Sequence, residues 1–196
     1  QTDGSTISVD VTITNIGDAA GKDIAELYYT PPYTNGGIEK SSVNLAAFDK
    51  TDLLQPGESQ ILTLSFEIED MASYDTYNTG HYVLEEGVYE ISLRTDSHTV
   101  MDSREYQVQG TVIYDENQTH NGDLVVAENR FGFAEGDITY LSRADGFANY
   151  AQVTAAPESY ELNGTVLANG TYDPTAYNNT EDVMPVTGAR NGMELF

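Results

Sequence analysis

The chain lacks several features that would assign it to common functional classes. It contains no cysteine, which excludes a disulfide framework and a thiolate metal site. It has no apolar run near the roughly 18 residues that a membrane-spanning helix needs. Basic residues are scarce, since 8 lysines and arginines stand against 32 acidic residues and leave a net charge of -24. Such a surface repels nucleic acid and anionic lipid, so neither is an expected partner.

Cofactor and metal patterns are weak as well. No glycine-rich phosphate-binding pattern occurs, so nucleotide binding has no support. Residues 117–128 partly follow a calcium-loop spacing, but the loop begins with Asn117 and no helix is expected beside it. We interpret it as a polar turn and expect no metal and no cofactor. The three histidines share no ligand spacing and are expected on turns or on the surface (His81, His98, His120).

Alternation of apolar and polar residues dominates the first half. The stretches TISVDVTITN (6–15), SQILTLSFEI (59–68) and VYEISLRTD (88–96) each place apolar side chains at every second position. Turn signals such as Pro56-Gly57 separate them, and no helical period is convincing. Residues 1–110 are therefore predicted to form an all-β, immunoglobulin-like antiparallel sandwich. Its expected interior includes Val9, Val11, Leu64, Phe66, Tyr89 and Ile91.

Residues 111–196 have a different composition, rich in Asn, Gly, Thr and Asp with short apolar clusters. No cluster is long enough to enclose its own core, yet the aromatic residues need a surface to cover. We predict a long, mostly extended segment that packs on the sandwich, less firmly after Pro157, with Arg143 and Asp145 near a domain junction. Both ends of the chain, Gln1–Ser5 and NGMELF, are expected to be the interior of a longer polypeptide.

Three pieces of the first half carry a family resemblance. They are VTITNIGDAAGKDIAELYYTPP, GGIEKSSVNLAAFDKTDLLQPGES and YVLEEGVYEISLRTDS. In order and spacing, residues 7–94 resemble the fibronectin type III-like domain of family 3 glycoside hydrolases, the β-glucosidase family. One departure is Ser41, where that family often has proline after IEK. The resemblance implies a fibronectin type III-like fold.

The second half resembles a narrower group. The stretches RFGFAEGDITYLSRADGFANY and DVMPVTGARNGMEL are similar to the connector in permuted, bacterial-type members of that family. In those members an α/β sandwich domain comes first, the fibronectin type III-like domain second and a barrel third. The resemblance implies that residues 111–196 lead from the sandwich toward a catalytic barrel that is absent from this chain.

The resemblance also implies that this chain does not carry the chemistry. Retaining glycosidases use two carboxyl groups about 5 Å apart. In this family one is an aspartate of the barrel, normally followed by tryptophan, and the other usually belongs to the neighbouring α/β domain. This chain has no tryptophan. We expect no catalytic residue here, a hydrolase activity of the parent in carbohydrate metabolism, and an accessory role that braces the two catalytic domains, which are the expected partners.

A carbohydrate-binding module is the alternative. The loop from Tyr28 to Tyr33 is aromatic and punctuated by proline, and aromatic rings bind the faces of sugars. Tyr33 and Asn35 are its predicted substrate-binding residues, with a glycan as the partner. The purely structural interpretation is that Tyr28 or Tyr29 belongs to the core and that Tyr33 packs on a neighbouring domain.

Localisation is not determined by the residues themselves. The permuted relatives are often exported or membrane-anchored, which favours an extracytoplasmic protein held through parts of the parent outside this chain. A cytoplasmic location is the alternative, and the absence of cysteine fits both.

Overall fold

The computed structural model describes residues 4–130, 132–134, 139–155, 189–190 and 193–194. The chain divides into two compact units, residues 1–129 with 141–151 and residues 130–140 with 152–196. Each unit is described by itself below. Within the described part, no helix has the length and apolar character to cross a bilayer.

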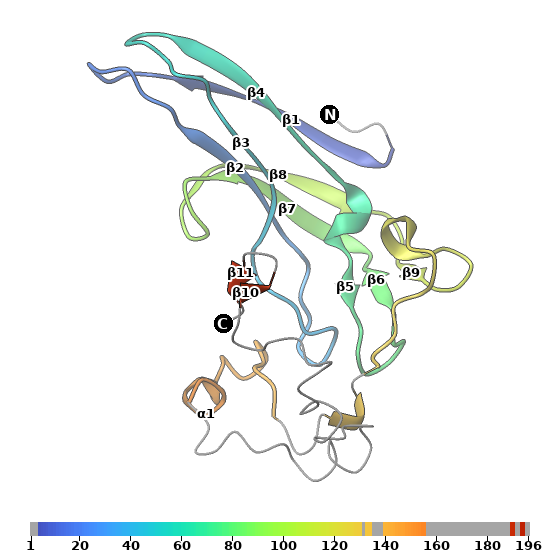
Figure 1. Cartoon of the computed structure of the whole chain (residues 1–196). Coiled ribbons are helices and arrows are strands. Elements are labelled where there is room, and N and C mark those ends of the chain that lie inside the picture. The colour runs from blue at the N-terminus through green and yellow to red at the C-terminus, as the bar shows by residue number, and fades with distance from the viewer. Residues whose placement is uncertain (1–3, 131, 135–138, 156–188, 191–192, 195–196) are drawn as a thin grey trace. The chain divides into compact units, whose positions relative to one another are not determined.

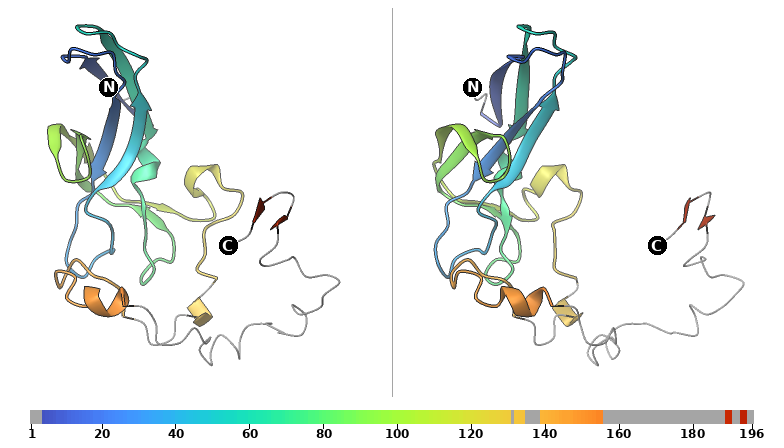
Figure 2. Two further views of the ribbon diagram at one scale, coloured as in Figure 1. Left: turned by 60° about the vertical axis from the view of Figure 1, so that its left-hand side comes forward. Right: turned by 90° about the vertical axis from the view of Figure 1, so that its left-hand side faces the viewer.

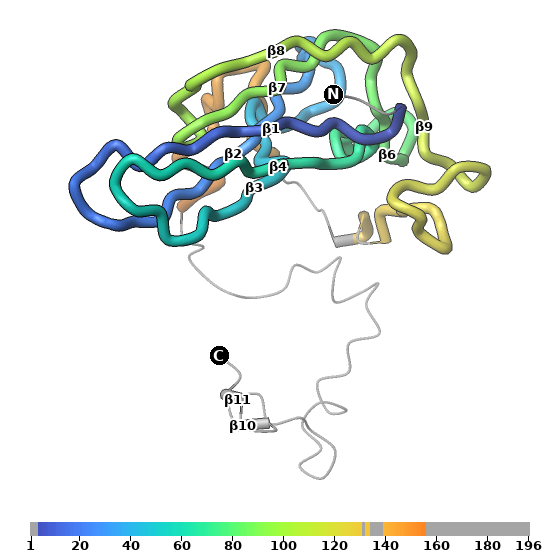
Figure 3. Tube along the Cα trace, turned by 90° about the horizontal axis from the view of Figure 1, so that it is seen from above, coloured from blue at the N-terminus to red at the C-terminus, as the bar shows by residue number. Residues whose placement is uncertain are grey.

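Antiparallel strands build the first unit (Figure 1). One sheet has the order β3-β2-β7-β8 and the other pairs β1 with β4. The chain trace seen from above in Figure 3 shows β1 running beside β4. A small third sheet has the order β5-β6-β9. This architecture confirms the predicted all-β fold. The strands are β1 Thr6–Thr14, β2 Ile24–Thr30, β3 Asn44–Lys50, β4 Ser59–Glu67, β5 Ser73–Tyr74, β6 Tyr82–Leu84, β7 Gly87–Arg94, β8 Val100–Val108 and β9 Val112–Tyr114.

The predicted alternation sets the core between the two main sheets. In β4 every second side chain is buried, and the β1–β4 register places Val11 opposite Leu62 and Val9 opposite Leu64. Five of the six predicted interior residues are buried (Val11, Leu64, Phe66, Tyr89, Ile91). Val9 is only half-buried, because β1 pairs with β4 alone among the described strands and its other edge stays open.

The second half of β7 is buried on both faces, which a single apolar stripe does not predict. Tyr89 and Ile91 face the core, while Ser92 and Arg94 are 0% and 7% exposed on the opposite face. Arg94 Nε donates to Ser92 Oγ at 2.7 Å and Arg94 Nη1 to the Ser97 carbonyl at 3.1 Å. The Arg94 guanidinium also lies 5.8 Å from the centre of the Tyr28 ring. The 95–99 hairpin loop is therefore held over a polar sheet face.

Strand β3 is irregular. It is the single strand within residues 41–54. Its pairing with β2 shifts register between Leu27 and Tyr28, which is a β-bulge. The bulge accounts for the irregular pattern, because an inserted residue changes which side chains face inward.

The residues after 110 begin by extending the first unit. Strand β9 pairs with β6, and Tyr114 is 4% exposed. The short 3₁₀ helix η2 (His120–Gly122) follows, and the His120 ring stacks on Tyr82 at 4.3 Å. His120 Nε2 lies 2.9 Å from the Glu69 carbonyl, in η1 (Ile68–Met71). His120 is thus a half-buried packing residue, which its polar surroundings in sequence did not indicate.

The next apolar residues do not pack on the sandwich as expected for this segment. Leu124 is 99% exposed and Val125 is 70% exposed. Further along lie η3 (Gly132–Ala134), α1 (Tyr150–Val153) and the antiparallel pair β10 (Ala189–Arg190) and β11 (Met193–Glu194). The expectation of less firm packing after Pro157 falls, for residues 157–188, outside the described residues. The division at residue 110 stays a prediction.

Candidate functional site: the 31–43 loop and its strap

The loop between β2 and β3, residues 31–43, is fixed at its base by proline and glycine. Pro31 is buried directly after β2. Gly87, at the start of β7, has φ +145°, and a Cβ placed on it would lie 3.1 Å from Pro32 Cγ. Glycine alone tolerates that backbone conformation and that close approach. The loop therefore leaves the sandwich in a defined direction, pressed against the turn that precedes β7.

An ion pair ties the loop to the same turn a second time. The Lys40 ammonium pairs with the Glu85 carboxylate, and the Lys40 side chain is 4% exposed whereas that of Glu85 is 30% exposed. Burial, and next the charge of Arg143, lower the pKa of Lys40. Because Lys40 is a buried cation and Glu85 is its counter-ion, the position of Glu85 is important for the structure of the loop.

Residues 141–151, called the strap here, return to this loop within the first unit. Glu39 receives three hydrogen bonds: from Ser142 Oγ at 2.7 Å, from the Arg143 backbone N–H at 3.0 Å and from the Tyr33 hydroxyl at 3.2 Å. Desolvation acts to raise the pKa of Glu39, but these donors outweigh it together and lower the pKa. Glu39 therefore holds the strap as a carboxylate, the form that accepts these bonds best.

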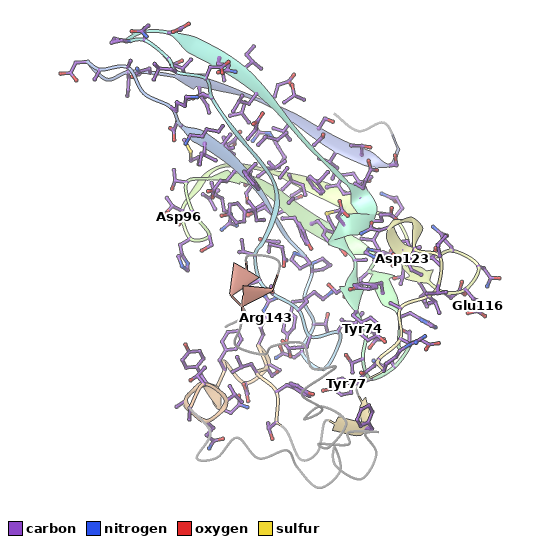
Figure 4. The ribbon with its side chains drawn as sticks, in the orientation of Figure 1. Tyr74, Tyr77, Asp96, Glu116, Asp123 and Arg143 are labelled. Carbon is purple, nitrogen blue, oxygen red and sulfur yellow. The ribbon has the colours of Figure 1, made fainter. Side chains whose placement is uncertain are left out.

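Arg143 adds a second attachment (Figure 4). Its guanidinium carbon lies 4.1 Å from the centroid of the Tyr33 ring, a cation–π arrangement. Its Nη1 also donates to the carbonyls of Lys40 and Ser41, both at 3.4 Å. Beside these contacts is a shallow hollow of about 390 Å³, lined by Glu39, Lys40, Ser41, Ser42, Val43, Leu141, Arg143 and Phe147.

The structure brings together some of the predicted residues and separates others. Tyr33 and Arg143 are in contact, whereas Asn35 is exposed on the adjoining turn. Tyr28 lies on a sheet face, where its hydroxyl donates to Glu26 at 2.7 Å, and Tyr29 belongs to the core. Asp145 accepts a bond from the Ala148 N–H at 3.2 Å, inside its own turn. The roles predicted for Tyr33 and Asn35 toward a sugar stay predictions.

Sequence reasoning missed Glu39, Ser142 and the Lys40–Glu85 pair. The available signal was charge, because residues 31–38 carry none and Glu39-Lys40 follow at once. The calcium-like frame is occupied by local bonds: Asn117 N–H donates to Asp115 Oδ1 at 2.8 Å, and Thr119 Oγ1 donates to the Asp123 carbonyl at 2.6 Å. Among the described residues no cluster of three metal-binding side chains is present.

Comparison with known proteins identifies the fold. The family described as "Fibronectin type III-like domain" matches residues 23–97. β-Glucosidase A of Butyrivibrio fibrisolvens is 33% identical over 162 residues, which are 79% of this chain and 19% of that protein. A β-glucosidase of Ruminococcus albus is 28% identical over 155 residues, 76% of this chain and 16% of that protein. The chain thus spans less than a fifth of the length of these curated relatives.

A solved structure agrees with the sequence matches. Thermotoga neapolitana β-glucosidase 3B, in complex with α-D-glucose, superposes with a TM-score of 0.52 at 33% identity. The match covers 58% of this chain and 15% of that one. The chain therefore contains the fibronectin type III-like domain of a β-glucosidase-like protein of glycoside hydrolase family 3.

Proposed function

We propose that this chain is a non-catalytic structural module of a family 3 glycoside hydrolase that acts on β-glucosides. In this account it braces the α/β sandwich domain of the parent against the barrel, and the 31–43 loop with its strap is the docking surface. The carrying observation is the attachment of the strap to Glu39 and Tyr33. A segment that continues along the chain is thereby held at a fixed place on the sandwich.

The construction of the loop supports a mechanical role. Three features order it: the close contact of Pro32 with Gly87, the Lys40–Glu85 pair and the Glu39 bonds to the strap. Ordering a loop of this length costs conformational entropy, on the order of 1 kcal/mol or more per residue. An interface that needs a fixed shape gains from such preorganisation, because less freedom remains to be lost on docking.

The relatives support the identity of the parent. They carry the name β-glucosidase, and in them this segment is less than a fifth of the protein. The rest of such a protein offers the other domains as partners. The alternative of a carbohydrate-binding module gains no support from these comparisons, and Arg143 lies over the Tyr33 ring that was to form its platform.

The test uses an aryl β-glucoside and two proteins, this chain alone and the full-length parent. We expect no turnover by the chain alone and turnover by the parent. In the parent, Arg143→Ala should lower the melting temperature of the catalytic domains. Arg104→Ala is the matched control, because the Arg104 side chain is 77% exposed and lies on β8. Turnover by the chain alone, or an unchanged melting temperature for Arg143→Ala, would contradict the proposal.

A further inference from the structure

A second ordered loop lies at the same end of the sandwich as the 31–43 loop. Residues 75–80, called the finger here, join β5 to β6. Asp75, which is 5% exposed, accepts bonds from the Asn78 N–H at 3.2 Å, Asn78 Nδ2 at 3.1 Å and the Thr79 N–H at 3.1 Å. The Gly80 N–H donates to the Asp75 carbonyl at 2.8 Å, and the Asp75 N–H donates to the His81 carbonyl at 2.9 Å. A buried carboxylate and the backbone together fix the finger.

This fixed loop presents a large aromatic side chain to solvent. Tyr77 is 74% exposed at the tip (Figure 4). The rings beneath it are engaged with one another, since Tyr74 packs edge-on against Tyr82 at 5.4 Å and Tyr82 stacks on His120. Tyrosine supplies a broad contact area at little cost in side-chain entropy, and it is enriched among the residues that dominate binding energy at interfaces.

The tips of the two loops carry no charge, although charged residues lie at their bases (Glu39, Lys40, Asp75 and Glu85). Residues 76–80 and 31–38 carry no charged side chain, in a chain that has 32 acidic residues. Figure 2 shows both loops at the same end of the sandwich. The loops at the opposite end, 15–23 and 51–58, are charged (Asp18, Lys22, Asp23, Asp52, Glu58). Depletion of charge together with enrichment of aromatics is typical of the centre of a protein–protein interface.

We propose that the finger docks on another domain of the same polypeptide, with the Tyr77 ring inserted into an apolar pocket of low charge. This inference rests on the proposed function, because it names a second contact of the same docking end. A protein partner fits better than a glycan because the finger offers one ring, rimmed by the neutral polar residues Thr76 and Asn78. An anchor ring with a polar rim is the arrangement of an interface hot spot.

The test is photo-crosslinking in the full-length polypeptide. Tyr77→p-benzoylphenylalanine is made in one protein, Tyr33→p-benzoylphenylalanine in a second and Phe48→p-benzoylphenylalanine in a third. Phe48 is the matched control, because it is 66% exposed on β3 and lies outside both loops. After irradiation, mass spectrometry identifies the peptides that are joined. We expect position 77 to crosslink to peptides outside residues 1–196, with a yield at least about tenfold above that of position 48.

The outcomes separate the finger from the proposed function. External crosslinks from position 33 but none from position 77 would overturn the finger and leave the docking loop standing. No external crosslink from either position would overturn both. A second measurement on the full-length protein gives the equilibrium constant for docking of the finger on its partner domain. This constant should fall about tenfold in Tyr77→Ala and less than about threefold in Tyr77→Phe. If soluble β-glucan shields the Tyr77 side chain from solvent in the isolated chain, the finger binds carbohydrate and the proposal is contradicted.

Discussion

Arg143 meets Tyr33 in two ways, directly through its guanidinium 4.1 Å from the ring centroid and indirectly through Glu39, which accepts bonds from both residues. The backbone and the side chain of one residue therefore fasten the strap to the loop. Because the two contacts use different atoms, they can be removed separately.

Removing the guanidinium should loosen the strap without unfolding the sandwich. A cation–π contact at a partly exposed site contributes about 0.5–1 kcal/mol. We expect Arg143→Ala to speed hydrogen exchange of the amides of residues 142–147 by roughly 2–5-fold, the equivalent of that free energy. Exchange in β4 should stay the same. Arg104→Ala is the control, and equal effects of the two substitutions would show that the contact does not hold the strap.

The strap should also respond to pH through Glu39. Since the hydrogen bonds lower its folded-state pKa below the ordinary 4.5, its contribution is fully present above that value. The contribution is lost as pH falls through the lowered pKa. The amide resonance of Arg143, followed by NMR, should shift in that acid range and stay constant near neutral pH. Glu39→Gln should abolish the transition, and persistence of the transition in that variant would assign it to another group.

The two partners of the Lys40–Glu85 pair should differ in what their loss costs. Glu85→Gln leaves the Lys40 cation, with a side chain 4% exposed, without its counter-ion. Breaking a buried pair in this way costs about 3–5 kcal/mol. Lys40→Met leaves Glu85, which is 30% exposed and can be hydrated, so a smaller loss is expected. Urea unfolding of both variants compares the two free energies, and the reverse order would refute the argument from burial.

Core packing gives a prediction that does not depend on the proposed docking surface. Phe66 is 6% exposed and its ring lies 6.4 Å from that of Tyr29. We expect Phe66→Ala to lower the free energy of unfolding by roughly 3–5 kcal/mol, from lost transfer energy and the cavity left behind. Phe48→Ala, at an exposed position, should change it by less than about 0.5 kcal/mol. A loss below about 1 kcal/mol for Phe66→Ala would mean that Phe66 is not in the core.

The sequence predicted the parts of the fold that depend on local alternation. Leu64 and Phe66 repeat every second residue in a strand with one buried face, so their burial followed directly from the pattern. Strand β7 departed from that rule because its second face is covered by a hairpin loop that Arg94 holds down. Polar residues such as Ser92 and Arg94 give no signal of burial until their partners are known.

The candidate site was harder to predict, because its contacts join distant segments. Tyr33 was singled out for its aromatic ring, and Arg143 for its place near an expected junction. No local sequence pattern indicated that the Arg143 guanidinium would lie over the Tyr33 ring. None indicated that Glu39 would accept a hydrogen bond from the backbone of the strap. Resemblance to a family located the domain, whereas the geometry of the strap required the three-dimensional structure.

In the proposed function, the 31–43 loop and its strap face other domains of the parent. Hydrogen exchange of this chain alone, compared with that of the same residues in the full-length polypeptide, reports whether those domains cover them. We expect the amides of residues 33–40 and 142–147 to exchange at least about tenfold more slowly in the full-length protein. The 15–23 loop at the opposite end should exchange equally in both. Identical exchange of residues 33–40 and 142–147 in the two proteins would contradict the account.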